Sequence, residues 1–322
     1  MIDLDERATA ERFVQTLHPG ATLLRAWAFE GGVSARVTAL RVKLADGETR
    51  MLVARQHRAV AAEFRLLRVV RSLGLPAPAP FHLDESCEVL STPVIVTEFI
   101  DGRPGPPRTN LADGLRQLAS TLAAIHGTDS SKFDLTFLPH RNAPYDDMAA
   151  ASRSAAVEPR YERHIREALT LASPLVQRNR SVLLHGDFWP GNTLWKDGRL
   201  VAVIDWDDAA FGDPLADVAN ARLEILFASG VEAMDAFTDE YRAAIPSVDF
   251  AHLPYWDLWA DLRLVPRIGE WGLDAETETT MRERHALFVT QAFDRLPADV
   301  SGRSAATAML PETFDRVFRS NV

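Results

Sequence analysis

A histidine, an aspartate and an asparagine lie close together in the stretch LLHGDFWPGNTLW, residues 183–195. Another aspartate, Asp205, ends the apolar run LVAVID, and an Asp-Gly pair between the two stretches predicts a hairpin that brings them together. The Asn192 carboxamide and the Asp205 carboxylate offer the hard oxygen atoms that Mg²⁺ prefers when water and phosphates fill its other positions. Asp187 then stays outside the metal ligands and can receive a proton. This division of roles suits phosphoryl transfer, in which catalysis is mostly positioning and charge neutralisation.

The elements that must position these side chains are predicted from the spacing of apolar residues. Residues 22–56 contain β-rich runs separated by Gly-Gly and Asp-Gly, which predict antiparallel strands with tight turns. Residues 58–73 carry apolar side chains at helical spacing, and PVIVTEFI at 93–100 is typical of a buried strand. Glycines and prolines then mark a linker. Beyond residue 110 the pattern is mainly helical, apart from a β-rich island at 182–205.

Taken together, these elements predict an α+β fold with two lobes. We expect a small N-terminal lobe with an antiparallel β-sheet at residues 1–100 and a larger, mainly helical lobe at residues 101–322. The hinge between them is expected at about residues 98–109. A chain of 322 residues that is 47% hydrophobic has enough apolar material for the cores of both lobes.

The charge and cysteine content of the chain limit the classes of binding partner and the cellular compartment that we expect. Residues 1–100 have 12 basic and 12 acidic side chains, whereas residues 101–322 have 23 basic and 33 acidic ones, which accounts for the net charge of −10. Nucleic acid requires a basic face, so we exclude it as a partner. Cys87 is the only cysteine, and the chain begins without an apolar signal segment. We therefore expect no internal disulfide, no membrane partner and a cytoplasmic location.

The motif HGDFWPGN followed by VIDWDDAAFGDPLADVA resembles the signature of the aminoglycoside phosphotransferase family. This family of small-molecule kinases has the protein-kinase-like fold and includes choline, homoserine and macrolide kinases. The resemblance implies that Asp187 is the catalytic aspartate, that Asn192 and Asp205 bind Mg²⁺, and that Asp217 braces the catalytic loop. The resemblance implies that His185 supports the catalytic loop; acid–base work is the alternative, although a histidine beside a buried strand more often has a structural role.

The N-terminal lobe resembles the family at its phosphate-binding elements. FEGGVSARV corresponds to the turn that covers the phosphates, where Gly31 and Gly32 allow close approach of the backbone and Ser34 can contact phosphate. Arg55 in LVARQ stands where the family has a phosphate-pairing lysine, and its expected ion-pair partner is Glu63 on the next helix.

The stretch VTEFIDG resembles the hinge that recognises adenine through backbone groups. The resemblance points to the carbonyl group of Glu98 and the N–H group of Ile100. ATP or GTP and Mg²⁺ are the implied cofactors.

The expected activity is transfer of a phosphoryl group from ATP or GTP to a hydroxyl group of a small molecule. The acceptor stays open between an antibiotic, an amino alcohol, an amino acid and a sugar, and the acidic second lobe favours a neutral or cationic one. Two alternatives are a nucleotide-binding regulatory protein with weak turnover and a metal-dependent hydrolase that uses His185, Asp187 and Asp205. Asp207 and Asp208 could join the metal site, but solvation or pairing with basic groups is the commoner role.

An acceptor pocket in the second lobe is a weaker hypothesis, because helix packing is the usual role of tryptophans. The candidates are Trp256, Asp257, Trp259, Asp261 and Glu270.

Overall fold

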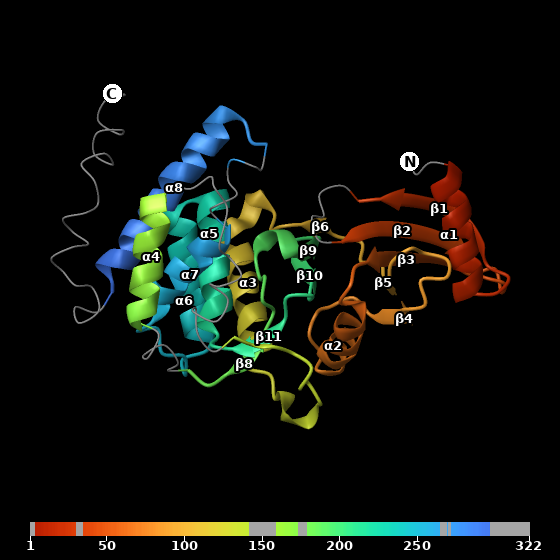
Figure 1. Ribbon diagram of the computed structural model, residues 1–322, viewed down its shortest axis with the longest axis horizontal. Helices are drawn as coiled ribbons and strands as arrows, with labels where there is room; N and C mark the ends of the chain where they lie inside the picture. Colours follow the sequence, from red (N-terminus) through yellow and green to blue (C-terminus); the bar gives the residue numbers. More distant parts are fainter. Residues whose placement is uncertain are drawn as a thin grey trace. The chain divides into compact units, whose positions relative to one another are not determined.

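The computed structural model describes residues 4–29, 35–141, 159–172, 179–264, 269 and 272–296. The chain divides into two compact units (Figure 1). The first unit consists of residues 1–138 and 185–209, and the second consists of residues 139–184 and 210–322. The expected lobe boundary at residues 100 and 101 stays a prediction. None of the helices in the described ranges has both the length and the apolar character needed to cross a membrane.

The first unit is built on a five-stranded antiparallel sheet with the order β1-β2-β3-β5-β4. Its strands are β1 (Thr22–Ala28), β2 (Arg36–Lys43), β3 (Thr49–Gln56), β4 (Pro80–Asp84) and β5 (Val94–Glu98). The predicted Asp46-Gly47 turn joins β2 to β3, and Gly47 has a φ of +89° that glycine adopts without steric cost. The buried run VIVT of β5 lies between β3 and β4, which confirms the strand predicted there.

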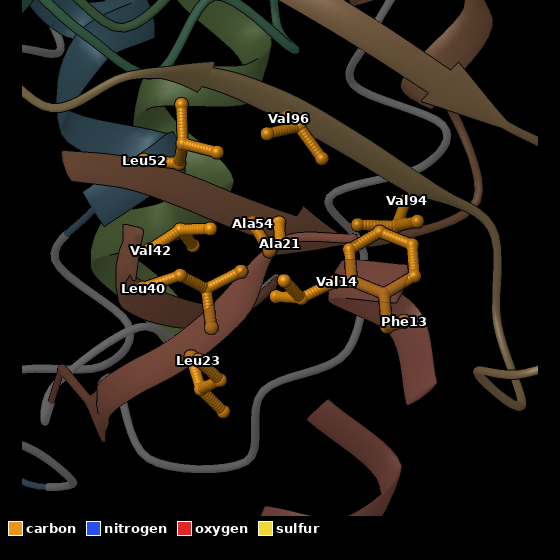
Figure 2. Close-up of a cluster of buried hydrophobic side chains, with 10 residues drawn as sticks. All are labelled: Phe13, Val14, Ala21, Leu23, Leu40, Val42, Leu52, Ala54, Val94 and Val96. Atoms are coloured by element: carbon orange, nitrogen blue, oxygen red, sulfur yellow. The ribbon is translucent and has the colours of Figure 1, made fainter. Parts of the chain in front are cut away.

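Two helices of the first unit pack on this sheet. Helix α2 (Val60–Ser72) confirms the predicted helix and contacts β4 and β5. Helix α1 (Leu4–Leu17), which was not predicted, contacts β1. Figure 2 shows Phe13 and Val14 of α1 among apolar side chains of the strands. This cluster consists of Phe13, Val14, Ala21, Leu23, Leu40, Val42, Leu52, Ala54, Val94 and Val96.

The motif-bearing hairpin also belongs to the first unit. Strands β9 (Thr193–Lys196) and β10 (Arg199–Val203) pair antiparallel, and β6 (Arg103–Pro104) pairs with β9. Asp197 and Gly198 form the predicted turn, with φ angles of +50° and +76°. Helix α3 (Leu111–His126) contacts β10.

The second unit is mainly helical. Its helices are α4 (Pro159–Ala172), α5 (Leu215–Ser229), α6 (Val231–Ala244), α7 (Leu253–Leu264) and α8 (Ala275–Asp294). Helix α5 contacts α6, α7 and α8, and most of its side chains are buried. A small sheet has the order β7-β11-β8, from β7 (His140–Arg141), β11 (Ala210–Gly212) and β8 (Val182–Leu184). The architecture is therefore α+β, as predicted.

Candidate active site

The β9–β10 hairpin brings the two halves of the motif together, as the sequence predicts. Thr193 pairs with Val203, and the N–H of Ile204 donates to the backbone oxygen of Asn192 over 2.9 Å. Asn192 and Asp205 therefore lie at the same end of the hairpin. Asp205 has a φ of +68°, a left-handed conformation that aspartate tolerates better than most residues and that turns the chain sharply after β10.

Asn192 is hydrogen-bonded to the expected catalytic aspartate. Its side-chain nitrogen donates to both the backbone oxygen and Oδ2 of Asp187, over 2.9 Å in each case. Asn192 is 7% exposed, so this carboxamide is held in one orientation. No described residue donates a hydrogen bond to its Oδ1 atom, which leaves that oxygen suited to a cation.

His185 supports the loop from its buried side. One ring nitrogen, Nε2, donates to the backbone oxygen of Ile204 over 3.0 Å, and Nδ1 accepts from the N–H of Asp187 over 3.3 Å. The ring is fully buried, with its centroid 4.6 Å from that of Trp206. Because both nitrogens bond to the backbone, the geometry favours a supporting role over acid–base work. It also leaves no lone pair for the metal that the hydrolase alternative requires.

Close approaches constrain two glycines of this loop, Gly186 more strictly than Gly191. Gly186 has a φ of +87°, and a Cβ atom there would lie 1.9 Å from the backbone oxygen of Asp208. A Cβ atom at Gly191 would lie 2.1 Å from the outer edge of the Trp189 indole ring, a contact that movement of this side chain can relieve. The glycines of the HGD and PGN segments therefore permit the compact path of the loop.

Arg55 bridges an acidic residue of α2 and the expected metal ligand. Its Nη1 atom donates to Oε1 of Glu63, which is the predicted ion pair, and Nη2 donates to Oδ1 of Asp205 over 2.5 Å. Burial alone would lower the pKa of Arg55, but the charges of Glu63 and Asp205 outweigh it and raise the pKa. Arg55 is therefore a fixed positive charge at the site. Its expected contact with phosphate stays a prediction.

Glu63 has a second partner, His57, that was not predicted. His57 Nε2 lies 2.7 Å from Glu63 Oε2, and these two side chains are only 6% and 2% exposed. His57 lies in the sequence between Arg55 and Glu63, the two members of the predicted ion pair. This position is the signal from which its contact with Glu63 could have been predicted.

Asp207 forms a carboxylate pair with Asp205. Burial, followed by a hydrogen bond with Asp205 and the charge of Asp205, raises the pKa of Asp207 to about 7. Burial also opposes ionisation of Asp205, but the nearby Arg55 charge outweighs it and lowers the pKa of Asp205. Asp207 therefore belongs to the immediate surroundings of the site rather than to the solvated surface.

The expected hinge residues lie at the end of β5: Glu98 is its last residue, and Ile100 follows two positions later. Glu98 exchanges hydrogen bonds with Ala79: its N–H donates to the Ala79 oxygen over 2.8 Å, and its Oε2 accepts from the Ala79 N–H over 3.3 Å. The N–H of Ile100 donates to no other group in the part of the chain that the structure describes. This open donor is consistent with the expected role in adenine recognition, which stays a prediction. Gly31, Gly32 and Ser34 lie outside the described residues.

The remaining candidates belong to the second unit. Asp217 is buried in α5, and its expected contact with the catalytic loop stays a prediction. Trp256 and Trp259 are 0% and 2% exposed and lie edge to face, with ring centroids 5.4 Å apart. Their burial favours helix packing over an acceptor pocket. Glu270 lies outside the described residues.

The two aspartates of α7 have internal partners. Asp257 accepts from the buried Arg222 through Nε and Nη2, over 3.0 and 3.2 Å. Asp261 accepts a hydrogen bond from His285 of α8. Burial raises the pKa of Asp257 against the opposing charge of Arg222. Both carboxylates are thus engaged in the packing of the helices.

Asp257 also borders a pocket in the second unit, but that pocket is not acidic overall. Its lining includes three arginines and three aspartates. These residues are Arg222, Arg242, Arg295, Asp235, Asp239 and Asp257. Asp257 therefore does not give this pocket the net negative charge that would select a cation.

Comparison with known proteins places this geometry in a family. The sequence model of the "Phosphotransferase enzyme family" (APH) matches residues 28–251, which is more than half of the chain. Escherichia coli hygromycin-B 4-O-kinase is 53% identical over 38 residues, which cover 12% of this chain and 11% of that protein.

Two longer matches come from animal proteins. Acyl-CoA dehydrogenase family member 10 of Mus musculus is 26% identical over 231 residues, covering 66% of this chain and 21% of that protein. Acyl-CoA dehydrogenase family member 11 of Homo sapiens is 24% identical over 201 residues, covering 58% of this chain and 26% of that protein. The chain thus spans about a fifth to a quarter of the length of these relatives.

Solved structures show a similar fold. A putative aminoglycoside phosphotransferase from Ralstonia eutropha has a TM-score of 0.63 at 13% identity, with 92% of this chain and 98% of that chain covered. A thermostable mutant of aminoglycoside phosphotransferase APH(4)-Ia, in a ternary complex with ADP and hygromycin B, has a TM-score of 0.62 at 19% identity, with 88% of this chain and 98% of that chain covered. Macrolide 2'-phosphotransferase type I has a TM-score of 0.63 at 18% identity, with 89% and 98% covered. These matches confirm the predicted protein-kinase-like fold class.

Proposed function

The chain belongs to the phosphotransferase enzyme family, and from this premise we propose that it transfers the γ-phosphoryl group of ATP or GTP to a hydroxyl group of a small molecule. We propose further that the reaction requires Mg²⁺. The observation that carries the proposal is the arrangement of Asp187, Asn192 and Asp205 at one end of the β9–β10 hairpin. Family membership supports phosphotransferase activity. The identity of the nucleotide, the requirement for Mg²⁺ and the class of the acceptor are our proposal.

The donor atoms at the end of the hairpin fit Mg²⁺. Asn192 offers a carboxamide oxygen and Asp205 a carboxylate, and Mg²⁺ prefers such hard oxygen ligands. Within the described ranges, no group of three or more histidine, cysteine, aspartate or glutamate residues could enclose a metal ion. A site with two protein ligands leaves positions for phosphate oxygens and water. When bound, the ion neutralises charge on the transferring phosphoryl group.

Asp187 is positioned to act on the acceptor hydroxyl. Its carboxylate would orient the hydroxyl group and accept its proton as the oxygen attacks the phosphoryl group. Asn192 restrains this carboxylate through Oδ2, and the His185 ring restrains the Asp187 backbone. Such restraint contributes to catalysis because the attacking group needs little reorganisation.

Arg55 is positioned to bind the phosphates. A guanidinium group can bond to phosphate and carboxylate oxygens at once, so Arg55 can keep Glu63 while it turns Nη2 from Asp205 to the nucleotide. This exchange would release the Asp205 carboxylate for the metal. It would also replace one anionic partner of Arg55, the Asp205 carboxylate, by another, a phosphate group.

The acceptor is proposed to be neutral or cationic. Support comes from the charge of residues 101–322, which carry 33 acidic side chains against 23 basic ones. Asp257 and Asp261 do not add support, because Arg222 and His285 engage them.

The proposal is tested by a coupled assay of ADP or GDP release with Mg²⁺ and a panel of aminoglycosides, macrolides, amino alcohols, amino acids and sugars. We expect at least one hydroxylated acceptor to stimulate nucleotide turnover, and Asp187→Asn to abolish the stimulation. Tight nucleotide binding without turnover across the panel would favour the regulatory alternative. Absence of nucleotide binding would overturn the proposal.

A further inference from the structure

We propose that His57 is a positioning residue of the nucleotide site, because it fixes the Glu63 carboxylate that in turn holds Arg55. The inference rests on the proposed function, since it concerns the grip of Arg55 on a nucleotide. His57 touches neither Arg55 nor Asp205 by any hydrogen bond within the described ranges, so its effect passes through Glu63.

The hydrogen bonds around His57 determine which ring nitrogen carries the proton. Nδ1 accepts from the backbone N–H of Ala59 over 3.3 Å, so the proton resides on Nε2. Nε2 then donates to Oε2 of Glu63 over 2.7 Å. The histidine therefore serves as a hydrogen-bond donor to a buried carboxylate, and it needs no positive charge to do so.

Glu63 is held at both of its oxygen atoms. Oε1 accepts from Arg55 Nη1, and Oε2 accepts from His57 Nε2. With one partner, the carboxylate could rotate about its terminal torsion, which is broad for glutamate. With two partners on different oxygens, the plane of the carboxylate is fixed. The Nη1 end of Arg55 is held with it, which leaves Nη2 to exchange Asp205 for a phosphate oxygen.

This fixation matters more for arginine than for lysine. A lysine ammonium group is a point charge with rotatable donors, whereas a guanidinium group must lie in the right plane to reach two acceptors. Arg55 uses Nη1 for Glu63 and Nη2 for Asp205, so the orientation set by Glu63 limits the acceptors that Nη2 can reach. His57 thus compensates for the geometric demand that arginine introduces at this position.

The position of His57 in the chain suits this role. It lies between the end of β3 at Gln56 and the start of α2 at Val60, so it joins the strand that carries Arg55 to the helix that carries Glu63. Its side chain is 6% exposed and that of Glu63 is 2% exposed, which excludes water as a ready substitute donor.

The test uses the full chain and calorimetry with a non-hydrolysable ATP analogue in the presence of Mg²⁺. His57→Phe keeps a planar aromatic ring but removes the donor, and we expect affinity to fall by about tenfold. His57→Gln places an amide donor near the position of Nε2 and should restore most of the loss. His285→Phe removes a similar histidine–carboxylate contact in the second unit and should leave nucleotide affinity unchanged.

A double-mutant cycle separates positioning from general destabilisation. If His57 acts through Glu63, His57→Phe should add less than a twofold loss of affinity in a Glu63→Gln background. Unchanged affinity in folded His57→Phe, or losses that multiply in the double variant, would overturn the proposal.

A nuclear magnetic resonance measurement of the His57 ring tautomer provides a readout in the free protein. We expect the neutral ring to carry its proton on Nε2. This proton should exchange with solvent more slowly in the parent than in the Glu63→Gln variant. A neutral ring protonated on Nδ1 would overturn the inference even if His57→Phe does not fold. If the parent chain binds no nucleotide, the proposed function fails, and the tautomer still decides whether His57 holds Glu63.

Discussion

The side-chain nitrogen of Asn192 lies 2.9 Å from both the backbone oxygen and Oδ2 of Asp187. One carboxamide therefore connects the expected proton acceptor to the expected metal site: its nitrogen restrains Asp187, and its oxygen is the proposed ligand. A change at Asn192 should affect two functions at once, whereas a change at Asp187 should affect only one.

Asp187→Asn should leave nucleotide affinity within about twofold of the parent and lower turnover by roughly 10²- to 10⁴-fold, the usual contribution of a positioned proton acceptor. The reason is that an amide keeps the shape of the side chain and still accepts from Asn192, but it does not take up the hydroxyl proton. Steady-state kinetics and calorimetry measure the two effects. Asp239→Asn, with a side chain that is 78% exposed, is the matched control. Turnover above about half of the parent value would contradict the assignment of Asp187.

Asn192→Ala should weaken Mg²⁺-dependent nucleotide binding and also lower turnover when Mg²⁺ is saturating. Excess metal can compensate for the lost ligand, but it cannot restore the hydrogen bond that orients Asp187. Turnover measured against Mg²⁺ concentration should therefore reach a plateau at least about tenfold below the parent. Full recovery at high Mg²⁺ would show that Asn192 acts only on the metal.

Gly186→Ala should disturb the loop more than an alanine at another left-handed glycine. Both Gly186 and Gly198 have positive φ, at +87° and +76°, so both substitutions cost about 1–2 kcal/mol in backbone strain. Only at Gly186 would the added Cβ meet a backbone oxygen, that of Asp208 at 1.9 Å, whereas nothing lies within 4 Å at Gly198. We expect Gly186→Ala to lower turnover and Gly198→Ala to preserve it at a temperature where both remain folded. Equal kinetics in the two variants would show that the close approach does not matter for activity.

Local patterns were sufficient to predict much of the fold. The Asp46-Gly47 and Asp197-Gly198 turns, the helix after residue 58 and the buried strand VIVTE follow from rules that act over a few residues. The hairpin at Asp197-Gly198 also explains why Asn192 and Asp205 come together. Helix α1 was not predicted, although Phe13, Val14 and Leu17 have helical spacing.

Contacts between distant residues could not be predicted in the same way. Arg55 and Asp205 are 150 positions apart, and no local rule relates them. The burial of Asp257 is a similar case, since its partner Arg222 lies on another helix. Carboxylates and tryptophans on α7 resemble a ligand pocket in the sequence, whereas in the structure Trp256 and Trp259 are buried and Asp257 pairs with Arg222.

Asp257→Ala should destabilise the fold rather than change acceptor affinity. The substitution leaves the Arg222 guanidinium, which is 2% exposed, without its charged partner, and breaking such a pair costs about 3–5 kcal/mol. Chemical denaturation measures this loss. Asp239→Asn removes a charge from the exposed rim of the same pocket and should change the free energy of unfolding by less than about 0.5 kcal/mol. A stable Asp257→Ala variant with a raised KM for the acceptor would return Asp257 to the acceptor site.

Arg55→Lys and Arg55→Ala should differ in both affinity and stability. Lysine keeps the positive charge and can pair with Glu63, but its single nitrogen does not span Glu63 and Asp205 as the guanidinium fork does. We expect Arg55→Lys to retain nucleotide affinity within about tenfold, and Arg55→Ala to lose more than that. Arg55→Ala should also lower the free energy of unfolding by roughly 2–4 kcal/mol, because Glu63 is 2% exposed and, among the described residues, keeps only His57 as a side-chain partner. Calorimetry and denaturation of the two variants measure these effects, with the exposed Arg50→Ala as the control. If Arg55→Ala binds nucleotide as tightly as the parent, the phosphates are held by another group.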